Sequence, residues 1–260
     1  MKKLLIFLLT AALAAGLALP AAAAGETDPL LTLVNPWNTI PEDWTVELKS
    51  IGGGHSVDKR CYDDLNAMLR DCRAAGLRPV VRSSYRTRRT QEQLYANKVR
   101  QWKGYGYSDS EARKKAAAIV APPDTSEHQL GLAVDLVDAS YQTLDSRQAD
   151  TPAQKWLMAH SWEYGFILRY PTDKSDVTGI IYEPGHYRYV GRDYARQICE
   201  SGLCLEEWLD KRQEARAVES AIAAGPTGRC GIKRRAPDGA KRRLCSGGEA
   251  DSPPSFSVPV

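Results

Sequence analysis

Two of the four histidines in the sequence lie close to acidic residues in patterns that could support hydrolytic chemistry. His128 precedes Asp135 by seven positions in SEHQLGLAVDL, and His186 follows Glu183 by three positions in YEPGHYRYVG. Asp135 interrupts an apolar run with the alternation of a strand, where a buried carboxylate is costly unless it is paired, hydrogen-bonded or bound to a metal. The other two histidines lie in contexts typical of surface or packing residues.

These four residues match the inventory of a zinc hydrolase. Catalytic zinc takes three nitrogen or oxygen ligands from the protein and leaves a fourth position to water, whose pKa falls to about 7. His128, Asp135 and His186 could supply the three ligands, and Glu183 could accept the proton of the water and return it to the leaving amine. A histidine and an aspartate seven positions apart also occur often by chance, so the residue types alone leave a structural role open.

The elements that must position these residues read as a mixture of helices and strands. Helical periodicity and capping signals mark the helices, and apolar runs between turn residues mark the strands. We expect helices over 57–75, 90–103, 108–118, 153–164 and 193–223, the last interrupted at Gly202, and strands over 78–85, 131–136, 166–170 and 179–190, the last with a break. His128 would be delivered by the loop before the second of these strands.

The wording of four segments adds a family resemblance to this pattern. SEHQLGLAVDL resembles the SxHxxGxAxD motif of the VanY type of D-alanyl-D-alanine carboxypeptidases, which are zinc peptidases. YEPGHYRYVG resembles the closing ExxH motif of this family, SSYRTRRTQEQLY its SxYR segment, and YGFILRYP its connecting strand. The likeness runs in the same order over roughly residues 55–210.

The resemblance implies the fold and the metal site. The expected fold class is α+β, in which one catalytic domain holds an antiparallel sheet flanked by helices, as in DD-peptidase/hedgehog-like folds. His128, Asp135 and His186 match the ligands of Zn²⁺ in this family, and Glu183 matches its catalytic base.

The resemblance also implies substrate contacts. Arg86 matches the arginine that engages the terminal region of the substrate, and a guanidinium can hold a terminal carboxylate through two parallel hydrogen bonds. Ser126 and Gln93 are expected as weaker substrate contacts. Two residues depart from the family pattern: Gly185 stands where tryptophan is usual, and Asp124 where glycine is frequent. The first departure removes a large wall beside the metal, which bears on substrate preference.

The leading hypothesis is a zinc carboxypeptidase that removes the terminal D-alanine from peptidoglycan stem peptides. The nearest alternative is an L,D-carboxypeptidase that acts on tetrapeptide stems. A D-Ala-D-Ala dipeptidase fits less well, because that activity usually belongs in the cytosol and this chain carries an export signal. The non-catalytic alternative is a cell-wall binding module that retains the fold, although such a module has no need of a base at Glu183.

Composition divides the chain into four parts. Two lysines, an apolar run and a small-residue region form the layout of an export sequence, with an uncleaved amino-terminal anchor as the lesser alternative. The protein is therefore expected outside the cytoplasmic membrane, at the cell wall or the membrane. Trp37 and Trp44 are expected to pack onto the domain. The expected parts are a signal peptide (1–25), an extended leader (26–54), the zinc D,D-carboxypeptidase domain (55–224) and a basic, disordered tail (225–260).

Charge and cysteines say more about the carboxyl-terminal region. The net charge of +3 conceals a basic segment, because residues 211–243 hold ten Lys or Arg against three Asp or Glu. We expect this region to bind anionic wall polymers or lipid head groups, with a solvated tail as the alternative, and no nucleic acid.

Six cysteines in an exported chain permit disulfides. The plausible local pairs are Cys199 with Cys204 and Cys230 with Cys245.

Overall fold

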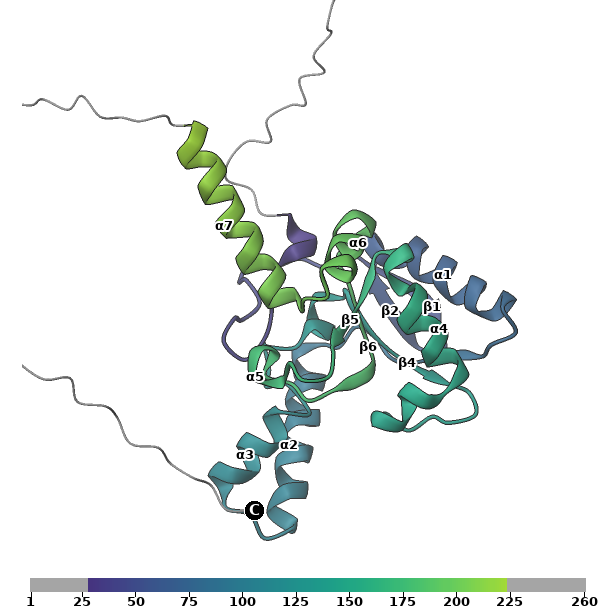
Figure 1. Ribbon diagram of the computed structural model, residues 1–260. Coiled ribbons are helices and arrows are strands. Elements are labelled where there is room, and N and C mark those ends of the chain that lie inside the picture. The colour runs from purple at the N-terminus through teal and green to yellow at the C-terminus, as the bar shows by residue number, and fades with distance from the viewer. Residues whose placement is uncertain (1–27, 224–260) are drawn as a thin grey trace, which may run out of the picture. The chain divides into compact units, whose positions relative to one another are not determined.

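The computed structural model describes residues 28–223 (Figure 1). The expected signal peptide, the expected tail and the pair of Cys230 with Cys245 lie outside the described residues. One compact unit extends to Arg216, and the chain from Ala217 onward belongs to a second unit, of which only the helical residues up to Ala223 are described. Among the described residues, no helix has both the length and the apolar character that a bilayer crossing requires.

A four-stranded antiparallel sheet forms the centre of the first unit (Figure 1). Its strands follow the order β3-β4-β6-β5, and a separate hairpin pairs β1 with β2. Antiparallel strands combined with helices confirm the expected α+β class. The strands are β1 (Leu48–Gly52), β2 (His55–Asp58), β3 (Pro79–Ser83), β4 (Ala133–Asp138), β5 (Phe166–Tyr170) and β6 (Glu183–Tyr189).

Several helices begin at polar side-chain caps, and two end at glycines. Ser108 forms a capping box with Glu111 at the start of α3. Gly202 adopts a left-handed conformation with φ 66° and separates α6 from α7. The α-helices are α1 (Lys59–Ala74), α2 (Arg88–Gly104), α3 (Asp109–Ala117), α4 (Pro152–His160), α5 (Ser175–Thr178), α6 (Arg192–Ser201) and α7 (Leu205–Ala223).

One face of the four-stranded sheet belongs to the main apolar core. Val134 and Leu136 of β4 and Tyr187 of β6 are fully buried there. They share this core with Leu65 of α1 and Leu157 of α4, which are also fully buried. We call this the apolar face of the sheet. Its side chains alternate along β4 with those of the opposite face, as the pleat of a strand requires.

The opposite face carries buried polar and charged side chains, and we call it the charged face. The register pairs Asp135 with His186 and Ala133 with Arg188. Directly opposed residues of an antiparallel pair project to the same side, so Asp135 and His186 are neighbours across the strands. Arg169 of β5 lies on this face as well, two residues after Ile167, which pairs with Arg188.

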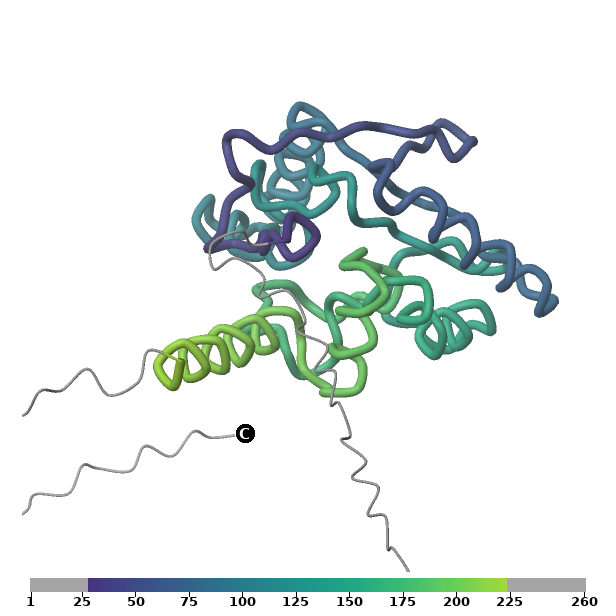
Figure 2. The backbone as a smooth tube through the Cα atoms, turned by 90° about the horizontal axis from the view of Figure 1, so that it is seen from above, coloured from purple at the N-terminus to yellow at the C-terminus, as the bar shows by residue number. Residues whose placement is uncertain are grey.

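The amino-terminal segment, drawn in purple in Figure 2, contacts Arg188 of the charged face and the loop that carries His128. Arg188 donates from Nη2 to the carbonyl oxygen of Thr32 at 2.9 Å, and the Ile40 N–H donates to the carbonyl oxygen of Asp124 at 2.9 Å. Trp44 packs against the apolar core, as expected. The expectation for Trp37 is wrong, since 64% of its surface is exposed.

Two further expectations are corrected by the structure. The sequence predicts two strands separated by a break over 179–190, but only the second of them forms. Gly179 has φ 76°, and the Ile181 N–H donates to the carbonyl oxygen of Ala118 rather than to a neighbouring strand. Cys199 and Cys204 are both free, so the expected local disulfide is not formed.

Candidate metal centre

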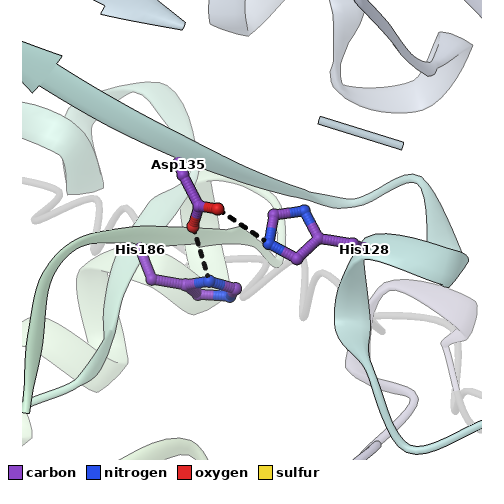
Figure 3. Close-up of side chains that lie close together, drawn as sticks. All are labelled: His128, Asp135 and His186. Atoms are coloured by element: carbon purple, nitrogen blue, oxygen red, sulfur yellow. Dashed lines mark hydrogen bonds and ion pairs between the residues drawn. The ribbon is translucent and has the colours of Figure 1, made fainter. Parts of the chain in front are cut away.

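Three buried side chains meet on the charged face of the sheet: His128, Asp135 and His186 (Figure 3). Each offers one ligand atom, and these atoms all lie within 4.8 Å of one another. Asp135 stands between the two imidazoles, with Oδ2 3.2 Å from His128 Nε2 and Oδ1 3.0 Å from His186 Nδ1. The structure thus brings together the three residues that the sequence nominates as metal ligands.

Local backbone geometry delivers each of them. His128 lies on a short 3-10 turn, Glu127–Leu130, which Gly131 closes with φ 74°. A side chain at Gly131 would be strained by this φ, and its Cβ would lie 3.2 Å from the Asp58 backbone nitrogen. His128 then faces the strand pair that carries Asp135 and His186.

The donor set fits zinc. The carbonyl oxygen of Ser84 lies 2.9 Å from His128 Nδ1 and can only accept, so Nδ1 carries the proton and Nε2 presents a lone pair toward Asp135. A backbone carbonyl that holds the second ring nitrogen of a histidine is the usual support of a zinc ligand. Two imidazoles and one carboxylate leave a fourth position open, as in catalytic zinc sites.

The surroundings of the cluster keep the Asp135 carboxyl group ionised. Burial raises the pKa of its carboxyl group, but the neighbouring His128, His186 and Arg86 outweigh this and hold the pKa well below its usual range. Burial and Arg86 lower the pKa of His128 to about 4. Burial also lowers the pKa of His186, but the carboxylates of Asp135 and Glu127 outweigh burial and raise it to about 9. Metal binding would therefore displace a proton from His186.

Glu183 lies beside the cluster at the start of β6. Its Oε2 is 3.9 Å from His186 Nδ1, and its half-buried side chain lines the same cavity of about 570 Å³ as the three candidate ligands. Burial raises the pKa of Glu183 to about 7. A carboxyl group that titrates near neutral pH can both accept and return a proton during turnover.

The three expected substrate contacts fare differently. Arg86 lines the cavity, where Nη2 donates to Asp135 Oδ2 at 2.9 Å and Nε donates to Ser83 Oγ at 2.8 Å. Ser126 is buried and also lines the cavity. Gln93 is exposed on α2, and it is not among the described residues that line the cavity. The buried glutamine of α2 is Gln91, whose Oε1 accepts from Arg86 Nη1 at 3.4 Å.

Steric crowding in the cavity wall explains why position 185 is a glycine. A Cβ at this position would lie 2.8 Å from the carbonyl oxygen of Leu136 and 3.2 Å from Leu144 Cδ2. Leu144 lines the cavity and 46% of its surface is exposed. Leu144 therefore stands beside the position at which the family pattern usually has a tryptophan.

Sequence reasoning missed several residues of the site. The Tyr170 ring lies 4.8 Å from the His186 ring and lines the cavity. Glu127 is buried behind His186, and both Arg169 and Arg188 donate to its Oε1. A signal for the two arginines was present, because each interrupts an apolar or aromatic strand in the same way as Asp135.

Comparisons with known proteins agree with this geometry. The family model described as VanY, D-alanyl-D-alanine carboxypeptidase, matches residues 54–192. A D-alanyl-D-alanine carboxypeptidase of Enterococcus faecalis (strain ATCC 700802 / V583) is 42% identical over 186 residues, which cover 71% of this chain and 67% of the relative.

Two solved structures extend the likeness to three dimensions. A crystal structure of a vancomycin resistance D,D-pentapeptidase, a VanY mutant in complex with Zn(II), is 41% identical, with a TM-score of 0.64 over 70% of this chain and 99% of that chain. A VanYB structure in complex with D-alanine-D-alanine is 41% identical, with a TM-score of 0.65 over 70% of this chain and 98% of that chain. The chain thus belongs to the VanY family of D-alanyl-D-alanine carboxypeptidases.

Proposed function

We propose that this protein is a zinc-dependent carboxypeptidase that removes the terminal D-alanine from peptidoglycan stem peptides ending in D-Ala-D-Ala. The observation that carries the proposal is the convergence of three candidate zinc ligands, Glu183 and Arg86 on one cavity. The Zn(II) and D-alanine-D-alanine complexes of similar proteins support the choice of metal and substrate.

The residues of the chain divide the work of hydrolysis. Zinc bound at this centre would act as a Lewis acid and would lower the pKa of a bound water to about 7. Glu183 accepts a proton from the attacking water and returns it to the leaving amine, for which a pKa of about 7 is well suited. His128, Asp135 and His186 would hold the metal, the histidines through ring-nitrogen lone pairs and Asp135 through a carboxylate oxygen.

Arg86 selects for a free carboxyl terminus. A guanidinium has five N–H donors, and Arg86 uses one each from Nε, Nη1 and Nη2 within the protein. The remaining donors can engage the terminal carboxylate of the peptide, and Ser126 can contact the substrate nearby. Gln93 lies outside the cavity lining, so a substrate could contact it only beyond the cavity.

The direct test is to incubate the purified protein with tri-, tetra- and pentapeptide stems and to weigh the products. The proposal expects loss of one alanine from the pentapeptide and little cleavage when the last residue is amidated. Glu183→Gln serves as the control against a contaminating peptidase. Cleavage of the tetrapeptide alone would identify an L,D-carboxypeptidase, and release of a dipeptide would identify a dipeptidase.

We also propose that the chain is exported and that its basic carboxyl-terminal segment attaches it to anionic wall polymers or lipid head groups. The support is the signal-like layout of residues 1–25 and the excess of Lys and Arg over residues 211–243. Truncation after Ala224 should leave activity on soluble peptides intact and weaken salt-sensitive binding to isolated walls. Wall binding that is unchanged by the truncation would contradict this attachment.

A further inference from the structure

Two complementary atoms face each other behind the candidate metal centre. Glu127 Oε2 lies 3.4 Å from His186 Nε2, and both side chains are buried. Within residues 28–223 neither atom forms a regular hydrogen bond with any partner, and each is the polar atom that faces the other. A buried carboxylate oxygen and a buried ring nitrogen without other partners are costly unless they serve each other.

The arrangement matches what His186 needs as a ligand. Its Nδ1 faces Asp135 Oδ1 inside the cluster, so Nδ1 is the nitrogen that would bind the metal. The ring proton must then reside on Nε2, and this N–H requires an acceptor. Glu127 Oε2, at 3.4 Å, is the acceptor that faces this N–H, whereas the corresponding acceptor for His128 is the carbonyl oxygen of Ser84.

Buried arginines fix Glu127 in this orientation. Arg169 Nε donates to Glu127 Oε1 at 2.7 Å, and Arg188 Nη1 donates to the same oxygen at 2.9 Å. Both guanidinium groups are fully buried. With Oε1 engaged twice, Oε2 is left to His186.

Both guanidinium groups are permanently cationic and pair directly with Glu127, which favours its anionic form, and a carboxylate can only accept hydrogen bonds.

We propose that Glu127 is a positioning residue that fixes the Nε2–H tautomer and the ring orientation of His186, and thereby tightens zinc binding. The inference rests on the proposed role of His186 as a zinc ligand. The 3-10 turn thus contributes to the metal centre twice. Its Glu127 orients His186, and its His128 is itself a ligand. Support of this kind is worth about 10–100-fold in metal affinity.

Glu206 offers a matched control. It accepts from Arg169 Nη1 at 2.9 Å and from Asn35 Nδ2 at 3.1 Å, so it belongs to the same buried ion network. No contact with His186 is found for it among the described residues. Glu206→Gln and Glu127→Gln each remove one negative charge from this network, but only Glu127→Gln alters the partner of His186.

The experiment measures zinc affinity by competition with a chelator in the wild type and in both variants, after circular dichroism has shown that each is folded. Glu127→Gln should bind zinc about 10–100-fold more weakly, while Glu206→Gln should remain close to the wild type. Equal affinity in all three proteins, or an equal loss in both variants, would overturn the proposal.

A second measurement does not use Glu127→Gln, so it tests the proposal even if that variant does not fold. The nitrogen NMR signals of the four histidines in the zinc-loaded protein report which ring nitrogen carries the proton. His186 should show a metal-bound Nδ1 and a protonated Nε2. Metal on Nε2 would overturn the role of Glu127 while leaving zinc ligation by His186 intact. If His186→Ala retained its zinc, the metal assignment itself would fail instead.

Discussion

Both faces of the four-stranded sheet are buried, but they bury opposite kinds of side chain. The apolar face holds Val134, Leu136 and Tyr187 in the main core. The charged face holds Asp135 and Arg188 within hydrogen-bond distance of oppositely charged or polar partners. The comparison shows that burial can serve packing on one side of a strand and chemistry on the other, provided that each buried charge has a partner.

A single strand register serves both faces. Pairing of Asp135 with His186 also sets Val134 opposite Tyr187 on the other side of the sheet. A shift of one residue would turn every side chain of β4 to the wrong face. Apolar packing therefore indirectly holds the two strand-borne ligands in place.

The largest effect is expected from Glu183→Gln, which removes the proposed base from the rim of the charged face. Turnover should fall by about 100- to 10,000-fold, because general acid/base groups typically contribute that much. Zinc content should not change, since Glu183 is not among the three clustered ligands. Steady-state kinetics and metal analysis of the same preparation check this. Loss of metal from the variant would make Glu183 a ligand.

The second-largest effect is expected from Arg188→Met, which disrupts the ion pairs of the charged face. It leaves Glu127 with Arg169 as its remaining guanidinium partner and removes the hydrogen bonds to the amino-terminal segment. Breaking a buried ion network typically costs about 3–5 kcal/mol of unfolding free energy. Zinc affinity should weaken as well, because Glu127 supports His186. Denaturant unfolding and chelator competition give the two quantities, and a stable variant with full zinc affinity would refute the distinction between the faces.

Leu65→Ala tests the apolar face by comparison. Leu65 is fully buried on α1, and truncation of a buried leucine costs about 2–5 kcal/mol of unfolding free energy. Zinc affinity and turnover per folded molecule should stay near the wild type, because Leu65 contacts the core and not the centre. Urea unfolding followed by tryptophan fluorescence measures the loss. A large fall in zinc affinity would show that the two faces are not separable.

The smallest of these effects is expected from Arg86→Lys, which keeps the charge but loses the planar fork. An ammonium cannot hold a terminal carboxylate through two parallel hydrogen bonds. We expect kcat/KM on free-acid peptides to fall by at least about tenfold, from the roughly 1.5–3 kcal/mol of one charge-assisted hydrogen bond. The amidated peptide should be equally poor with both proteins. Equal cleavage of both peptides by the wild type would argue for an endopeptidase.

The sequence predicts much of the site because its anomalies are local. Asp135 in an apolar strand, with His128 seven positions before it, draws attention to the centre, although the family resemblance of the motifs is needed to assign the zinc ligands. The boundaries of β5 are also predicted, because apolar residues lie between Gly165, which has φ 82°, and Pro171.

What the sequence did not predict depends on long-range contacts. Arg169 and Arg188 interrupt their strands in the sequence, but nothing local shows that both pair with Glu127, which lies more than 40 positions earlier. Gln93 and Gln91 differ by two positions on α2, yet only Gln91 turns inward to Arg86. The exposure of Trp37 likewise cannot be deduced from its residue type.

The central claim is that His128, Asp135 and His186 bind one zinc, and metal analysis tests it most directly. The wild type should hold about one zinc per chain, and His186→Ala should hold very little. His160→Ala is the matched control, because His160 is a half-buried histidine that pairs with Glu163 outside the cluster. Of the two variants, His160→Ala should keep its full zinc content and His186→Ala should not. Equal zinc content in the wild type and in His186→Ala would contradict it.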